Sequence, residues 1–222
     1  TNIILQVKST QVWLDQLSKK YDRSINKLDQ IPIEELEHLA NNGFNALWLI
    51  GIWERSTASK KIKENMNNYN SDASAYSIYD YNISEDLGGS TAFENLNKSA
   101  KLLGIKIGCD IVPNHTGIYS KWIIEHPEYF IQTKESPFQN YNFNSTNLSE
   151  HKDIELYIDQ NYYEQTDAAV VFKYVNSKTK KTNYIYHGND GTNIPWNDTA
   201  QLNFLKSEVR SAVTDIILDI AK

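Results

Sequence analysis

The sequence has almost no cysteine and no long apolar segment. Its single cysteine, Cys109, has no second cysteine with which to form a disulfide or a thiolate metal cluster, so we expect it to pack as a small buried apolar side chain. No apolar run approaches the roughly 20 residues that a membrane-spanning helix needs. The first residues also lack the basic head of a signal peptide. We therefore expect no disulfide framework and no membrane partner, and the cellular location stays open.

Positive charge is scarce as well. The chain has 22 Lys and Arg against 28 Asp and Glu, a net charge of -6, and its basic residues are scattered along the sequence. Nucleic-acid-binding proteins gather basic residues on one face. We expect a neutral or polar ligand and no nucleic-acid partner. With 40% hydrophobic residues, the 222-residue chain can bury a sizeable core.

Apolar spacing in the first half predicts two successive helix-then-strand units. Residues 33–41 have helical spacing and precede an Asn-Gly stop signal, and residues 45–51 are continuously apolar, as in a strand buried on both faces. The same order recurs at 91–103, where Ser90 is the expected helix cap, and at the apolar run 105–112. Tandem units of this kind predict a parallel α/β fold, either doubly wound or a barrel.

The helix-strand alternation stops over residues 116–202, which are rich in aromatic residues and Asn and contain an expected hairpin at 168–174 and 182–186. With the apolar opening of the chain as the first strand, this segment is typical of a domain inserted after the third strand. Helical spacing returns from residue 203. Because the sequence does not begin with methionine and ends at Lys222 within that helix, we expect both ends to be cuts through a longer protein.

Three polar residues, Asp110, Asn114 and His115, lie at and just beyond the end of the second apolar strand. The carboxyl ends of parallel strands are where functional groups converge. A carboxylate, an amide and an imidazole together supply the acceptors and donors that grip sugar hydroxyls. From these residues alone, a binding site and a simple hydrogen-bonded tie at the strand end are equally good interpretations.

The segment Asp110-Ile-Val-Pro-Asn-His115 resembles the first signature region of the α-amylase family (glycoside hydrolase family 13), which runs Asp, three residues, Asn, His. Upstream, residues 43–49 resemble the family's second strand, and Ala75-Tyr-Ser-Ile-Tyr-Asp-Tyr81 is similar to its Gly-Tyr, three residues, Asp-Tyr segment. Residues 86–93 resemble the turn into its second helix, and residues 201–203 fall where a fifth signature region lies. The resemblance covers essentially the whole chain.

The resemblance implies an α/β fold, the first part of a (β/α)8 TIM barrel with an inserted irregular β-containing domain B after the third strand. Residues 1–115 would form the first three βα units, residues 116–202 domain B, and residues 203–222 the barrel helix after the third strand. An eight-stranded barrel needs about 250 residues before insertions. We therefore expect the rest of the same polypeptide to close the barrel.

The resemblance also implies roles for three residues in substrate binding. His115 would hydrogen-bond the glycosyl unit at the cleavage point, Tyr76 would stack on that ring, and Asp110 would act as a supporting acceptor. Stacking suits a pyranose because an aromatic face can cover its C–H groups while the hydroxyls reach polar groups. The alternative for Tyr76 is a buried aromatic among 14 tyrosines. His187 and the segment 189–191 before Trp196 are weaker candidates, since ordinary turn chemistry explains them too.

Calcium is the one metal that the resemblance raises. Asn114 matches a residue that binds calcium in many family members, a role suited to an amide oxygen. At Gln201, however, many members carry an Asp that is a ligand where calcium is bound. Loss of that charge weakens an oxygen-ligand site, so we expect no cofactor and disfavour calcium.

The implied activity is that of a retaining glycoside hydrolase or transglycosylase acting on α-glucosidic bonds of α-glucans or maltooligosaccharides. Retention requires two carboxyl groups about 5 to 5.5 Å apart, and the family's nucleophile and acid/base are expected beyond Lys222. We therefore expect this chain to supply substrate-binding residues but no catalytic carboxylates, and to be inactive alone. The alternative is a catalytically silent barrel that serves as a glycan-binding or protein-interaction module.

Overall fold

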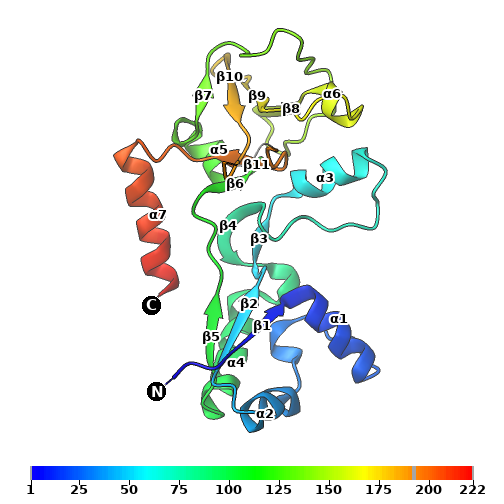
Figure 1. The fold of residues 1–222 in the computed structure, drawn as a ribbon, viewed down its shortest axis with the longest axis vertical. Coiled ribbons are helices and arrows are strands. Elements are labelled where there is room, and N and C mark those ends of the chain that lie inside the picture. Colours follow the sequence, from blue (N-terminus) through cyan, green and yellow to red (C-terminus); the bar gives the residue numbers. More distant parts are fainter. Residues whose placement is uncertain (1, 192–193, 222) are drawn as a thin grey trace. The chain divides into compact units, whose positions relative to one another are not determined.

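The computed structural model describes residues 2–191 and 194–221 and is drawn in Figure 1. The chain folds into two compact units. The first contains the residues up to 54 and residues 81–111, and the second contains residues 55–80 and the residues from 112 onward. Strands β3 (Trp53–Arg55) and β4 (Ile78–Ile83) include the points where the chain passes from one unit to the other.

The first unit is built on a three-stranded parallel sheet with the strand order β1-β2-β5 (Figure 1). Leu47 and Leu49 on the central strand are fully buried, whereas Val7 and Trp48, which are register partners, are 43% and 38% exposed. The expectation that residues 45–51 are buried on both faces is therefore wrong, because the face with Trp48 is open to solvent. The strands of this sheet are β1 (Leu5–Ser9), β2 (Ala46–Ile50) and β5 (Lys106–Cys109).

The last strand of this sheet is shorter and less buried than the apolar run 105–112 predicts. It ends at Cys109, Lys106 is exposed, and Cys109 is only partly buried. The reason is its position, since β5 is an edge strand of the sheet and packs against β2 on one side. Burial still raises the pKa of the Cys109 thiol to about 12, which keeps it protonated.

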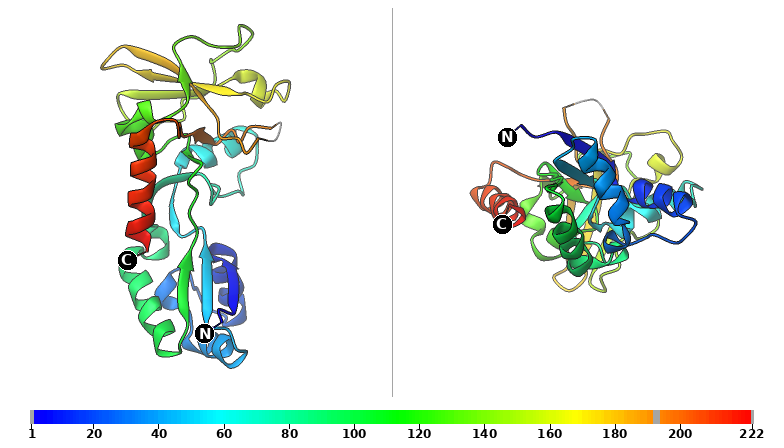
Figure 2. Two further views of the ribbon diagram at one scale, coloured as in Figure 1. Left: turned by 60° about the vertical axis from the view of Figure 1, so that its left-hand side comes forward. Right: turned by 90° about the horizontal axis from the view of Figure 1, so that it is seen from below.

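Helices lie beside this sheet in Figures 1 and 2. The helix predicted at residues 33–41 is confirmed with the same bounds. The next helix begins at Gly89, so Ser90 lies inside it and is not its cap. Gly88, with φ at +92°, occupies the cap position because a 3-10 turn runs directly into the helix there. The helical segments are α1 (Thr10–Lys20), η1 (Leu28–Gln30), α2 (Ile33–Asn41), η2 (Glu85–Leu87) and α4 (Gly89–Leu102).

The second unit contains a four-stranded antiparallel sheet with the order β7-β10-β9-β8. The hairpin predicted at residues 168–186 is confirmed as β9 and β10, with the turn displaced slightly from the expected position. Phe172 and Tyr174 from β9 are among the largest fully buried side chains and belong to one apolar cluster. The strands are β7 (Gln132–Thr133), β8 (Ile154–Ile158), β9 (Val171–Asn176) and β10 (Lys181–Tyr186).

A second, two-stranded pairing joins β6 (His115–Gly117) to β11 (Thr199–Gln201) in the same unit. The helical segments of this unit are α3 (Thr57–Asn65), α5 (Lys121–Glu125), η3 (Pro127–Tyr129), α6 (Gln160–Tyr163) and α7 (Ser207–Ile220).

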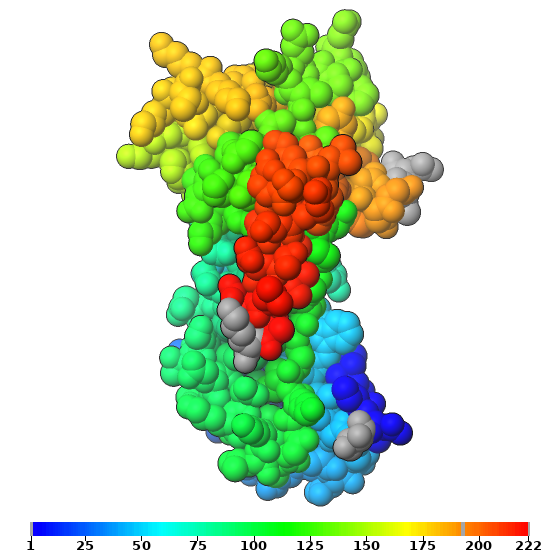
Figure 3. All heavy atoms as spheres, turned by 90° about the vertical axis from the view of Figure 1, so that its left-hand side faces the viewer, coloured from blue at the N-terminus to red at the C-terminus, as the bar shows by residue number. Residues whose placement is uncertain are grey.

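Helix α7 lies at the surface in Figure 3. It begins at Ser207, four residues after the predicted start, and Leu205 before it is 92% exposed. Val209 and Val213 are buried in the apolar cluster, whereas Leu218 is exposed. Within the described residues, none of the helices has the length and apolar character that crossing a membrane requires.

Candidate functional site

The pairing of β6 with β11 places the predicted site residues of the second unit. In this antiparallel register, His115 lies opposite Gln201 and Gly117 opposite Thr199. Gly117 permits a close approach of the segment 55–80, because a Cβ there would lie 2.4 Å from Cβ of Ser56. The first residue of β6 is therefore held beside a strand more than 80 residues away in sequence.

The imidazole of His115 is enclosed by groups from the segment that precedes β11. The side chain is 6% exposed, and its ring centroid lies 5.1 Å from that of Trp196. On another side, a Cβ at Gly188 would lie 3.1 Å from Cβ and Cγ of His115. Gly188 and Trp196 are joined by an antiparallel bridge. The bridge thus places both Gly188 and the ring of Trp196 against the imidazole of His115.

The surroundings of His115 keep it neutral and define which nitrogen carries its proton. Burial lowers the pKa of His115, and the backbone of Tyr76 and the carboxylate of Asp198 oppose that shift. The side-chain amide nitrogen of Asn114 lies 3.3 Å from Nδ1 and can only donate, which favours the tautomer with the proton on Nε2. Although Tyr76 is close, Nε2 is buried and has no hydrogen-bond partner of good geometry among the described residues. It is a buried donor with the backbone of Tyr76 beside it.

Tyr76 lies beside His115 through its backbone, and its side chain is 53% exposed. The interpretation of Tyr76 as a buried core aromatic is therefore wrong. Its backbone N–H donates to Oγ of Ser74 over 3.2 Å, which fixes the turn that carries it. The structure thus brings together two of the three predicted substrate-binding residues and leaves the aromatic face of Tyr76 accessible.

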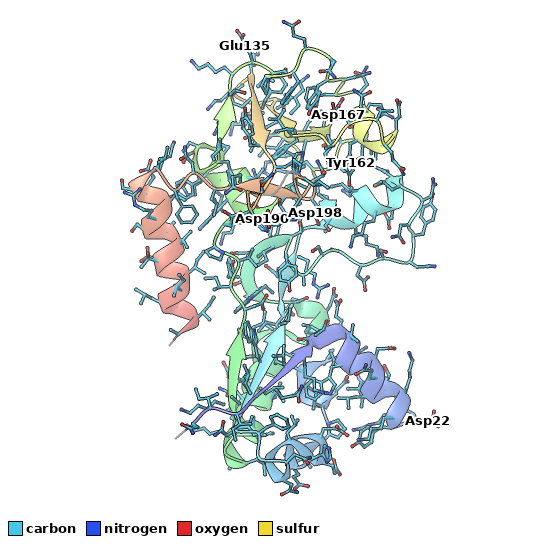
Figure 4. The ribbon with its side chains drawn as sticks, viewed as in Figure 1. Asp22, Glu135, Tyr162, Asp167, Asp190 and Asp198 are labelled. Carbon is cyan, nitrogen blue, oxygen red and sulfur yellow. The ribbon has the colours of Figure 1, made fainter. Side chains whose placement is uncertain are left out.

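Asp198 ties the segment that carries Tyr76 to the strand that pairs with His115. Its carboxylate accepts from Oγ of Ser59 over 2.6 Å, and its backbone carbonyl accepts from Oγ of Ser77 over 2.7 Å. Figure 4 shows Asp198 next to β11. Because both hydroxyls belong to the segment 55–80, these bonds fix Tyr76 relative to β11.

Asn114 and Gln201 form a reciprocal pair of side-chain amides. Nε2 of Gln201 donates to the backbone carbonyl and to Oδ1 of Asn114, each over 3.0 Å. In return, Nδ2 of Asn114 donates to Oε1 of Gln201 over 3.2 Å. Oε1 also accepts from the backbone N–H of Asn189 over 3.0 Å. This amide pair, Asn114 with Gln201, joins the residue before β6, the end of β11 and the segment after Gly188.

Asp110 belongs to the first unit, and there it ties off the strand end. Its Oδ1 accepts from the backbone N–H of Gly51 over 3.3 Å, and its carbonyl accepts from Nε1 of Trp53 over 2.8 Å. Both partners follow β2, the neighbouring strand. The carboxylate therefore links the ends of β2 and β5, and its role in substrate binding stays a prediction.

Sequence reasoning assigned no role to Gly188 or Asp198 and gave Trp196 only a minor one. The single sequence signal was the aromatic that follows an Asn-Asp-Gly segment, which a turn explains equally well. His187 is 3% exposed: its Nδ1 bonds the carbonyl of Thr199 over 2.9 Å, burial lowers its pKa to about 4, and its Nε2, like that of His115, has no partner of good geometry among the described residues. Through this hydrogen bond, His187 stabilises the first residue of β11.

The parallel strands, their helices and the irregular β unit that follows form a mixed α/β structure, and solved structures of α-amylase type resemble it in fold. An α-amylase from Lactobacillus plantarum is 18% identical, covers 97% of this chain and has a TM-score of 0.54. A trehalose-6-phosphate hydrolase from Bacillus licheniformis is 17% identical over 97% of the chain, with a TM-score of 0.58. At these identities, the likeness concerns the fold.

The family model for the α-amylase catalytic domain matches residues 23–218, and the chain belongs to this family. A curated relative, an α-1,4-glucan:maltose-1-phosphate maltosyltransferase from Picrophilus torridus, is 28% identical over 160 residues, which is 62% of this chain. The chain spans 25% of that relative and 35% and 32% of the two solved structures.

Proposed function

We propose that this chain is part of a retaining glycoside hydrolase or transglycosylase that acts on α-glucosidic bonds of α-glucans or maltooligosaccharides. The observation that carries the proposal is the buried His115, whose Nε2 has no hydrogen-bond partner of good geometry among the described residues, next to the backbone of Tyr76, whose side chain is exposed. A buried donor without a partner is unfavourable to folding, and a bound ligand or water is one explanation for such a group. A sugar hydroxyl is a suitable partner, while Tyr76 covers the C–H face of the same ring.

The roles divide between this chain and the rest of the polypeptide. His115 and Tyr76 bind the glycosyl unit at the cleavage point, Asp110 contributes an acceptor, and the nucleophile and acid/base come from residues beyond Lys222. Residues 116–202 are an insertion in a barrel that begins with residues 1–115, and residues 203–222 return to it. The exposed face with Val7 and Trp48 is the part of the sheet that further barrel strands would cover.

A steady-state assay of the complete polypeptide on maltoheptaose, with and without an acceptor sugar, tests the activity. The His115→Ala variant should lose about 100-fold in kcat/KM, as when one preorganised donor is removed from an active site. His38→Ala, on the exposed side of α2, is the matched control and should retain full activity.

The same assay separates the proposed enzyme from a catalytically silent module. Binding of maltoheptaose without turnover by the wild-type polypeptide would favour a glycan-binding barrel. If the folded polypeptide neither binds nor cleaves maltoheptaose, both the proposed enzyme and the glycan-binding barrel are contradicted. Appreciable turnover by residues 1–222 alone would refute the assignment of the catalytic carboxylates to the rest of the polypeptide.

A further inference from the structure

The amide pair Asn114 with Gln201 stands at a junction of three segments. Leu202 donates from its backbone to the carbonyl of Asn114 over 3.2 Å, so the β6–β11 pairing continues past the amides. Nδ2 of Asn114 also lies 3.3 Å from the carbonyl of Asn189. The pair therefore connects the entry to β6, the exit of β11 and the segment that begins at Gly188.

Backbone groups determine which way the Gln201 amide faces. The N–H of Asn189 can only donate, so the side-chain atom of Gln201 that it meets must be the oxygen, Oε1. The carbonyl of Asn114 can only accept, so the atom that it meets must be the nitrogen, Nε2. A reversed amide would set donor against donor and acceptor against acceptor. The orientation is thus fixed independently at both ends.

This orientation does not fit a resident calcium ion. The two oxygens that Asn114 would offer to a cation, its carbonyl and Oδ1, both accept from Nε2 of Gln201. Calcium takes six to eight oxygen ligands, including carboxylates. Within residues 2–191 and 194–221, no group of three or more His, Cys, Asp or Glu side chains is placed to hold a metal. An N–H donor therefore occupies the position that a cation would need.

We propose that the side-chain amide of Gln201 takes the place of a calcium ion in this chain and holds the site together without metal. Like a cation, it presents positive charge density to the carbonyl and Oδ1 of Asn114, and it adds an acceptor for Asn189. The amide of Asn114 in turn fixes Nδ1 of His115. Removing the amide pair would make the segment that carries Gly188 and Trp196 more mobile, and the imidazole of His115 would lose its fixed orientation.

The proposal concerns how the site is held and does not rest on the proposed activity, because its test is thermal stability. The complete polypeptide is melted in EDTA and in CaCl2, as wild type, Gln201→Met and Gln201→Glu. Gln139→Glu, an exposed position in the same unit, controls for the added charge. A calcium ion bound elsewhere would shift the Tm of all four proteins alike.

We expect Gln201→Met to lower Tm by about 4 °C or more, with the same calcium response as wild type. In Gln201→Glu, two acceptor oxygens would face those of Asn114, so its Tm in EDTA should fall below that of Gln139→Glu and rise on adding calcium. A calcium response of the wild type that disappears in Gln201→Met would show Gln201 to be a calcium ligand and would overturn the proposal. Equal melting of Gln201→Glu and Gln139→Glu in EDTA, or no added response to calcium, would also overturn it.

Discussion

The sheet β1-β2-β5 and the pair β6-β11 are held together in different ways. In the first unit, apolar side chains such as Leu47 and Leu49 pack between strands and helices. In the second unit, the strands that carry the candidate site are held by the close contact of the Ser56 side chain with Gly117, a buried histidine and the amide pair Asn114 with Gln201. The first arrangement tolerates change of side-chain detail, whereas the second depends on individual atoms.

The largest effect is expected where the β6-β11 region has no space for a side chain. In Gly117→Ala, the new methyl group would lie 2.4 Å from Cβ of Ser56, which must move. The free energy of unfolding should fall by about 3 kcal/mol or more, as for a severely overpacked site. Denaturant melts measure this. A loss below 0.5 kcal/mol, about the limit for a neutral surface change, would mean that the close contact between Gly117 and Ser56 does not constrain the fold.

The buried histidine makes the stability of the second unit sensitive to acid. The pKa of His187 in the folded state, about 4, lies below the ordinary value of 6.5, so the unfolded chain takes up the proton first as the pH falls. This contribution is complete above pH 6.5 and is lost between pH 6.5 and about 4, by up to about 3 kcal/mol. Denaturant melts across this range should show a shallower pH dependence for His187→Gln. An unchanged slope would exclude His187 as its source.

A smaller effect should come from the stacking tyrosine. Tyr76→Ala removes an accessible ring and should raise KM for maltoheptaose roughly tenfold, since aromatic contacts contribute about 0.5 to 1.5 kcal/mol beyond buried area. Tyr69→Ala is the matched control because Tyr69 is also exposed, at 68%, in the same unit. Identical KM values for the two variants would remove Tyr76 from the site.

The contrast between the two units also explains what could be predicted from the sequence. The bounds of α2 were predicted because its apolar spacing is local and regular, and the hairpin β9-β10 because its strands are adjacent in sequence. Helix α3 was missed because only a few of its residues, such as Ala58 and Ile62, pack against the core. Its sequence is predominantly polar, so few apolar residues mark it as a helix that packs on the core.

In the candidate site too, some residues were predicted from the sequence and others were not. Family resemblance identified Tyr76 and His115, and the structure brings them together. It did not indicate that Gly188 and Trp196 would enclose the imidazole, or that Gln201 would bond Asn114 from 87 residues away. These contacts depend on the register of β6 with β11, and no local pattern in the sequence encodes that register.

The protonation state of His115 in solution decides whether its imidazole is a neutral donor that binds the sugar. In the complete polypeptide labelled with 15N-histidine, nuclear magnetic resonance should show His115 as the neutral tautomer protonated at Nε2. Titration with maltoheptaose should shift the His115 Nε2 resonance and leave that of the enclosed His187 unchanged. A charged His115 at neutral pH, or a His115 resonance that saturating sugar does not move, would contradict the account.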